Sequence, residues 1–414
     1  MTSTTALAAH PTIHWHEGGQ DCSARWRSER GAPAPKKVVL ADDTMTADAA
    51  YRLACEGTAL LWRGDFQNAR QMLQALGRRI DQSARTDKRG RKRKLPIAPG
   101  VSSASFSAEE TAAAAARGFH LHRQAQAQRA RVLGMVLLSF GEDYGLALRR
   151  SPDARVACAQ AWGKSAVGEG TCVASMRELL GLVSAYEWRK NGVEISALGK
   201  APNNRIYPHY GVFSPVRGEY VGLVALAPLA EDVAALTIFD IGTGTGVLSA
   251  VLARRGVGQV VATDLDARAL ACASANLLQL GVTDSVNVQQ ADLFPEGLAD
   301  IIVCNPPWLP ARPSSPVEHA VYDEGSGMLL GFLNGLAAHL TPMGEGWLIL
   351  SDLAEHLGLR SRAELLAAIA SAGLEVVGRL DTLPVHAKAS DATDPLHAAR
   401  ALEVTSLWRL SAVH

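Results

Sequence analysis

The sequence lacks the features of secreted, membrane-spanning and disulfide-rich proteins. No apolar run approaches the ~20 residues of a membrane helix. Residues 1–16 lack the basic-then-apolar order of a signal peptide. The six cysteines form no Cys-x-x-Cys pair and are scattered, at Cys22, Cys55, Cys158, Cys172, Cys272 and Cys304. We therefore expect free thiols in a reducing compartment, which indicates a cytoplasmic protein without a zinc knuckle or a membrane partner.

Several common ligand motifs are also missing. His14-x-His16 has no further Cys or His at ligand spacing, so no metal site is predicted. No Gly-Lys-Ser/Thr phosphate loop occurs, and there is no obvious Asp–His pair for base catalysis. The run Gly242-x-Gly244-x-Gly246 differs from the dinucleotide motif Gly-x-Gly-x-x-Gly because position 247 is Val.

Charge is distributed unevenly, although Lys+Arg and Asp+Glu each total 41. Residues 1–230 contain 31 basic and 20 acidic side chains, whereas residues 231–414 contain 10 and 21. A basic front half favours an anionic partner such as RNA or a ribosome. The alternative is a charge-complementary interface between the halves. The densest basic block, residues 85–94, has seven basic residues in ten, and it either grips phosphates or forms a solvated loop.

The front half is expected to be mainly α-helical. Residues 1–43 are polar with Gly and Pro interruptions, which indicates a flexible N-terminal tail. Helical periodicity over 46–80, 108–150 and 173–188 predicts a helical domain over residues 44–191 that recognises the substrate. Residues 192–217 contain two short β patterns around Pro202-Asn203-Asn204, which predict a β-hairpin junction.

Residues 218–414 show a regular alternation of strand and helix. Strands are expected near 236–240, 259–263, 286–289, 300–304, 346–351, 374–380 and 402–409. Helices are expected near 246–255, 266–280, 326–340 and 361–372. Such alternation predicts an α/β fold with a mostly parallel, seven-stranded sheet and helices on both faces. The last two strands are expected to form an antiparallel edge.

Four predicted strands end in polar or glycine-rich groups. In order they end in Asp240-Ile-Gly-Thr-Gly-Thr-Gly246, Asp264, Asp292-Leu293 and Asn305-Pro306-Pro307-Trp308. In open α/β sheets the carboxyl ends of the strands share the edge where ligands bind. Glycine allows close approach of a ligand, and a carboxylate at Asp264 can accept hydrogen bonds from ribose hydroxyls. Proline has no backbone donor and stops the fourth strand, so Asn305 and Trp308 are held at this edge.

These residues resemble the class I S-adenosylmethionine-dependent methyltransferases, which have a Rossmann-like fold. Asn305-Pro306-Pro307-Trp308 is similar to the Asn-Pro-Pro-aromatic motif of the amino-methylating branch. The layout is closest to the protein N5-glutamine methyltransferases, which act on release factors or a ribosomal protein. The resemblance covers about residues 205–410. Two departures are Trp at position 308, where those enzymes usually have Tyr, and a longer front part with a basic block.

The resemblance implies S-adenosylmethionine as the cofactor and three sets of site residues. The cofactor-binding set is Asp240, Gly242, Thr243, Gly244, Thr245, Gly246, Asp264, Asp292, Leu293 and Asn305. The catalytic set is Asn305, Pro306, Pro307 and Trp308. The residues expected to line the substrate pocket are Phe213, Pro215, Arg217 and Trp308.

Physical chemistry gives this motif a mechanism. An amide or aryl amine is a poor nucleophile because its lone pair is delocalised. Two acceptors, the Asn305 side-chain oxygen and the Pro306 carbonyl, can hold both N–H bonds and turn the lone pair toward a methyl donor. The first expectation is N-methylation of a glutamine in a translation protein. The alternatives are an adenine N6 or guanine N2 amine of RNA or DNA, and a cofactor-binding module without catalysis.

Overall fold

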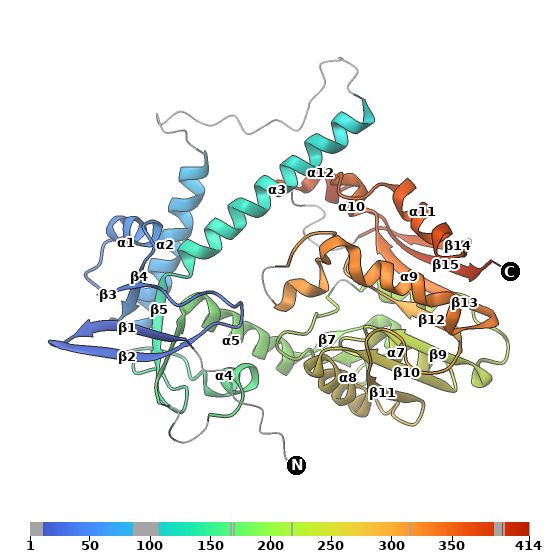
Figure 1. The fold of residues 1–414 in the computed structure, drawn as a ribbon. Coiled ribbons are helices and arrows are strands. Elements are labelled where there is room, and N and C mark those ends of the chain that lie inside the picture. The colour runs from blue at the N-terminus through green and yellow to red at the C-terminus, as the bar shows by residue number, and fades with distance from the viewer. Residues whose placement is uncertain are drawn as a thin grey trace, which may run out of the picture. The chain divides into compact units, whose positions relative to one another are not determined.

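The computed structural model describes residues 11–85, 107–165, 168, 170–216, 218–313, 316–384, 391 and 394–413. The chain forms two compact units (Figure 1), which we describe separately. The first comprises residues 1–103 and 121–186, and the second comprises residues 104–120 and 187–414. Residues 104–120 therefore leave the predicted front domain, and the helix α3 (Ala108–Leu133) belongs partly to each unit. Within the described ranges, no helix is long and apolar enough to cross a membrane.

The second unit contains a seven-stranded sheet with the order β11-β10-β9-β12-β13-β15-β14. Its strands are β9 (Thr237–Ile241), β10 (Gln259–Asp264), β11 (Val286–Gln290), β12 (Ala299–Cys304), β13 (Leu340–Ser351), β14 (Leu374–Thr382) and β15 (Thr405–Ala412). β9 to β13 pair in parallel, whereas β15 is antiparallel to both β13 and β14. The expected mixed α/β sheet with an antiparallel edge is confirmed.

Helices cover both faces of this sheet. Adjacent residues of each strand point to opposite sides, so an apolar strand has two faces to bury. One face packs on α6 (Glu219–Leu226), α7 (Val247–Arg254) and α8 (Ala267–Leu280). The other packs on α9 (Gly327–His339) and α11 (Arg362–Ser371). In β12, Ile301 and Val303 join the first core, and Ile302 and Cys304 join the second. Apart from Asp300, β12 is thus buried, with its carboxyl end at the ligand edge.

The predicted hairpin junction is present but short. β7 (Val193–Glu194) pairs antiparallel with β8 (Arg205–Ile206). Asn204 is 2% exposed, and its side-chain amide donates to Gly199 O at 3.1 Å and Glu194 Oε1 at 3.2 Å. The chain then runs along α8 before it enters α6.

The first unit contradicts the expectation of a mainly helical domain. It contains a six-stranded sheet with the order β1-β2-β6-β5-β4-β3. The strands are β1 (Thr12–Glu17), β2 (Gln20–Arg27), β3 (Lys37–Ala41), β4 (Thr58–Trp62), β5 (Val136–Phe140) and β6 (Cys172–Ser175). Its other helices are α1 (Ala47–Cys55), α2 (Phe66–Arg85), α4 (Arg155–Trp162) and most of α5 (Met176–Asn191).

Two of these errors have clear causes. β4 and β5 are short and almost wholly buried, and a short apolar run does not distinguish a buried strand from part of a helix. The tail predicted over 1–43 is wrong for its described part, because residues 12–41 contain three strands and Ile13 is 1% exposed. Apart from Arg85, which ends α2, the basic block 85–94 lies outside the described residues.

Candidate active site

The register of the sheet brings the predicted strand ends together. Ile241 of β9 lies opposite Thr263 of β10 on one side and Cys304 of β12 on the other. Asp264 of β10 lies opposite Gln290 of β11. The glycine-rich turn, Asp264, the Asp292 segment and Asn305 therefore follow adjacent strands at one carboxyl edge, as predicted.

The glycine-rich turn exposes backbone and buries its threonines. Gly242, Gly244 and Gly246 have φ of 71°, 56° and 79°, a region that favours glycine. The N–H groups of Gly242 and Thr243 donate to Thr263 O at 2.9 and 2.8 Å, which ties the turn to β10. Thr243 and Thr245 are 6% and 3% exposed. The accessible part of the turn is thus main chain, at Gly242 and Gly244, just before the start of α7.

Asp240 supports this turn from inside. It is 1% exposed, and its Oδ2 accepts from Thr243 Oγ1 at 2.7 Å, Ser249 N at 3.1 Å and Ser249 Oγ at 2.5 Å. Burial raises the pKa of Asp240, while the bonds from Ser249 and Thr243 oppose that shift. The structure thus places this predicted cofactor residue beneath the turn, where it fixes the path from β9 into α7.

Asp264 is half-buried at this edge and keeps acceptor capacity for a ligand. Its Oδ2 accepts from Gly244 N and its Oδ1 from Asp266 N, each at 3.0 Å. Burial raises the pKa of Asp264. A carboxylate has about four acceptor positions, so about two remain. Asp266 caps α8, accepting from Arg268 N at 2.9 Å, so it is Asp264 that keeps room for a ligand.

After β11, Asp292 and Leu293 lie in different surroundings, although the sequence predicted both as cofactor-binding residues. Asp292 is exposed. Leu293 has a φ of 69°, and its carbonyl accepts from Thr263 Oγ1 at 2.6 Å. Its side chain lies against α9, because a Cβ built at Gly331 would be 2.8 Å from Leu293 Cδ1.

Asn305 follows the buried end of β12 and is half-buried, as is Trp308, whereas Pro306 is buried. The indole Nε1–H of Trp308 donates to Asn305 Oδ1 at 2.9 Å. Cys304, immediately before them, is fully buried, and burial raises the pKa of its thiol well above the usual value. The thiol therefore stays protonated, and Asn305 is the polar group that this strand end presents.

The junction segment lies beside the cofactor turn. Asn276 of α8, 1% exposed, accepts from Tyr207 N at 2.8 Å and donates to Thr245 O at 3.0 Å. Phe213 is half-buried, Pro215 is buried, and Arg217 lies outside the described residues. The structure therefore places residues 207–212 along α8, and Phe213 and Pro215 follow directly in the chain.

Several residues that shape the site were not predicted. Two of them, Ser249 and Asn276, are described above. A third is Asp323, whose Oδ2 accepts from Met328 N at 2.8 Å at the start of α9. Met328 in turn covers the turn, because a Cβ built at Gly242 would lie 2.5 Å from its Cε. Only the helix-start position of Asp323 could have been inferred from sequence; the other contacts join positions far apart in the chain.

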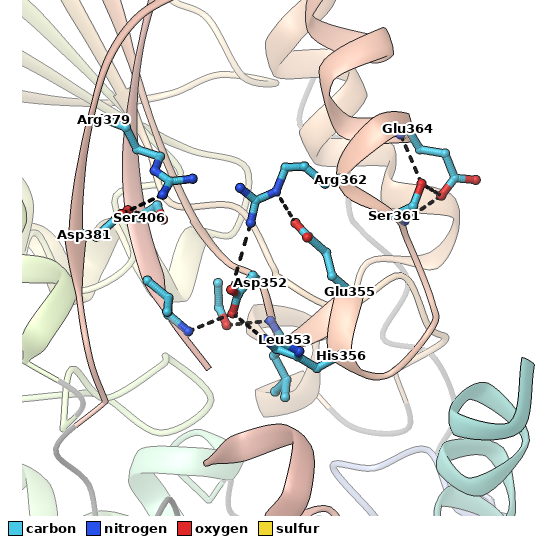
Figure 2. A network of polar contacts seen from close by, with 12 residues as sticks. Asp352, Leu353, Glu355, His356, Ser361, Arg362, Glu364, Arg379, Asp381 and Ser406 are labelled. Atoms are coloured by element: carbon cyan, nitrogen blue, oxygen red, sulfur yellow. Dashed lines mark hydrogen bonds and ion pairs between the residues drawn. The ribbon is translucent and has the colours of Figure 1, made fainter. Parts of the chain in front are cut away.

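A polar network occupies the same edge beyond β13 (Figure 2). Asp352 lies 3.4 Å from His356 Nε2 in α10 (Leu353–His356), and Arg362 pairs with Glu355 at 2.6 Å. The Arg362 guanidinium lies 5.1 Å from the ring centre of Trp408. These side chains are engaged with one another, so we assign the network to the packing of α10 and α11 on the sheet.

Comparisons with known proteins agree with this geometry. The profile of the family described as "Methyltransferase small domain" matches residues 203–352. A ribosomal protein L11 methyltransferase of Pelotomaculum thermopropionicum is 45% identical over 17% of this chain and 23% of its own length. A release factor glutamine methyltransferase of Cereibacter sphaeroides is 33% identical over 40% of this chain and 62% of its own length.

A third relative decides the family. It is a tRNA1(Val) (adenine(37)-N6)-methyltransferase of Shewanella loihica, 30% identical over 40% of this chain and 69% of its own length. The chain belongs to the methyltransferase small domain family. This is a family of S-adenosylmethionine-dependent methyltransferases. The chain spans less than two thirds of the length of the first two of these three relatives.

The residues present fit S-adenosylmethionine. The turn offers partly exposed main chain at Gly242 and Gly244, and Asp264 keeps acceptor positions beside it. We propose that the turn would hold the amino-acid part of the cofactor and that Asp264 would hold its ribose hydroxyls. Within the described ranges, no group of three or more His, Cys, Asp or Glu side chains is arranged to hold a metal ion.

Proposed function

We propose that the chain is an S-adenosylmethionine-dependent N-methyltransferase that modifies a planar nitrogen of a macromolecule. The observation that carries this proposal is the position of Asn305. It follows β12, and β12 pairs directly with β9, the strand that leads into the glycine-rich turn. The bound cofactor supplies an electrophilic methyl group. The chain's own contribution is the orientation of the accepting nitrogen.

Asn305 Oδ1 and the Pro306 carbonyl are the two acceptors in this mechanism. Together they hold both N–H bonds of an amide or aryl amine, which leaves the nitrogen lone pair directed out of that plane. The ring of Pro306 fixes its φ, and the following Pro307 restricts its ψ, which orients the carbonyl, so this acceptor is rigid. Catalysis then rests on positioning and on preorganised acceptors rather than on a strong base.

A glutamine side chain of a translation protein is our first candidate acceptor. It is supported by the relative from Cereibacter sphaeroides, by the hairpin junction before the sheet, and by the Asn-Pro-Pro-aromatic motif. An exocyclic amine of RNA is the second candidate. The Shewanella loihica relative and the excess of basic residues before position 231 favour it. In both cases we propose that the front unit binds the macromolecule.

The experiment uses purified chain, tritium-labelled S-adenosylmethionine and a cell extract. After incubation the extract is divided and treated with nuclease or with protease. Label lost to protease and retained after nuclease supports a protein acceptor, and the reverse supports RNA. Label that never exceeds the level without enzyme would overturn the proposal of methyl transfer.

A further inference from the structure

We infer that Trp308 is a positioning residue that fixes the orientation of the Asn305 carboxamide. This inference rests on the proposed function and deepens it, since it assigns the aromatic residue a role through Asn305. The observation is the hydrogen bond of 2.9 Å from Trp308 Nε1 to Asn305 Oδ1.

The chemistry of the pair makes the bond directional. An indole nitrogen only donates, whereas a carboxamide has an accepting oxygen and a donating NH2 group. If Asn305 turned its amide by 180°, two donors would face each other. Trp308 therefore selects the orientation in which Oδ1 is the acceptor. A tyrosine hydroxyl, which donates or accepts, would tolerate either orientation.

The indole is itself held in place. Trp308 is half-buried and packs against the buried cores on both faces of the sheet. Pro306 and Pro307 restrict the backbone between the two side chains. The donor is thus fixed before substrate arrives, so Asn305 does not have to be ordered during the reaction.

The bond leaves room for substrate. A carbonyl oxygen has two lone pairs, and Trp308 uses one of them. The second remains for one N–H of the accepting nitrogen. Asn305 Oδ1 therefore accepts only one N–H from the substrate. The second N–H of the same nitrogen needs a separate acceptor, so the site selects a nitrogen with two N–H bonds. This describes a primary amide or an exocyclic amine.

The first test is spectroscopic and needs no substrate. The chain has eight tryptophans, so selective 15N-indole labelling gives at most eight N–H signals, and Trp308→Phe assigns the one from Trp308. We expect this proton to exchange with water at least about tenfold faster in Asn305→Ala. We also expect its shift to move in that variant. A Trp308 signal that is the same in both proteins overturns the inference.

The second test separates positioning from stacking and from general stability. Trp308→Phe keeps an aromatic plane and removes the donor, and we expect the initial rate of label transfer to fall about tenfold, as expected for one lost hydrogen bond in the reacting geometry. The affinity for S-adenosylmethionine should stay unchanged. A wild-type rate in Trp308→Phe, or a parallel loss of cofactor affinity and melting temperature, would overturn the positioning role.

Trp188 provides the matched control, because it is 50% exposed in α5 and Trp188→Phe makes the same chemical change. It should leave rate, affinity and the Trp308 signal unchanged. If wild type neither binds S-adenosylmethionine nor transfers label, the proposed function fails. The spectroscopic test still reports whether Trp308 holds Asn305, so the two failures are distinguishable.

Discussion

Asp264 offers the sharpest test of the cofactor site. Two of its acceptor positions are used by Gly244 N and Asp266 N, and about two remain for ribose hydroxyls. A hydrogen bond to a charged group contributes about 1.5–3 kcal/mol. Losing two such bonds should cost about 3 kcal/mol or more, which is roughly a 100-fold loss of affinity. Asp264→Ala should therefore bind S-adenosylmethionine at least about 100-fold more weakly.

Isothermal titration calorimetry measures this directly, with Asp266→Ala as the matched control. Asp266 sits two residues away and caps α8, so its removal should cost about 1 kcal/mol of stability without weakening cofactor binding. Because burial raises the pKa of Asp264, wild-type affinity should also fall as pH is lowered, beginning above the ordinary value of 3.8. Equal affinities for wild type and Asp264→Ala would refute the assignment of Asp264 to the ribose.

Three further predictions follow from separate contacts. Gly242→Ala should weaken cofactor binding and lower the melting temperature, because its Cβ would lie 2.5 Å from Met328 Cε and its φ of 71° is strained for alanine. Adding Met328→Ala removes the steric contact but not the backbone strain, so it should restore only part of the lost melting temperature. Burial lowers the pKa of His209 from 6.5 to about 4, so its contribution to stability is complete above pH 6.5 and is lost as pH falls toward 4. His209→Gln should therefore flatten the dependence of the free energy of unfolding on pH in this range. An unchanged dependence would contradict this. Neutralising residues 91–94 should weaken binding to ribosomes or RNA and reduce its salt dependence, and an unchanged salt slope would assign the block to a solvated loop.

The second unit was largely predictable because glycine and proline mark the ends of its strands. The strand expected at 300–304 is β12 (Ala299–Cys304), and Pro306 and Pro307 fix where it stops. The helix expected at 266–280 is α8, which begins after its Asp266 cap. A change of periodicity between such markers is a strong signal for the four strands that carry the site residues. The other strands were placed less well, because β13 is Leu340–Ser351 where 346–351 was expected, and β15 is Thr405–Ala412 where 402–409 was expected.

The first unit was not predictable in the same way. The apolar stretch around residues 132–138 falls within the helical pattern expected over 108–150, yet α3 stops at Leu133 and β5 starts at Val136. Gly134, between them, was the available signal. β1 also escaped prediction, because only Ile13 of its side chains is buried.

The finer chemistry of the site depends on contacts that spacing does not encode. Asn276 joins Tyr207 to Thr245, and these three residues lie on separate elements. The bond from Trp308 to Asn305 is local in sequence, but its existence depends on how two cores hold the indole. Sequence motifs predicted which residues meet, and packing decides how they are oriented.

The most direct test of the central claim compares wild type with Asn305→Ala in two measurements on the same preparations. Calorimetry should show that Asn305→Ala still binds S-adenosylmethionine, with at most about a tenfold loss of affinity, because Asn305 is only one of the expected cofactor contacts. Transfer of labelled methyl groups to the acceptor in cell extract should occur with wild type and fall at least about 100-fold in Asn305→Ala, as for the loss of a preorganised group in an active site. Transfer by Asn305→Ala at the wild-type rate would contradict the account.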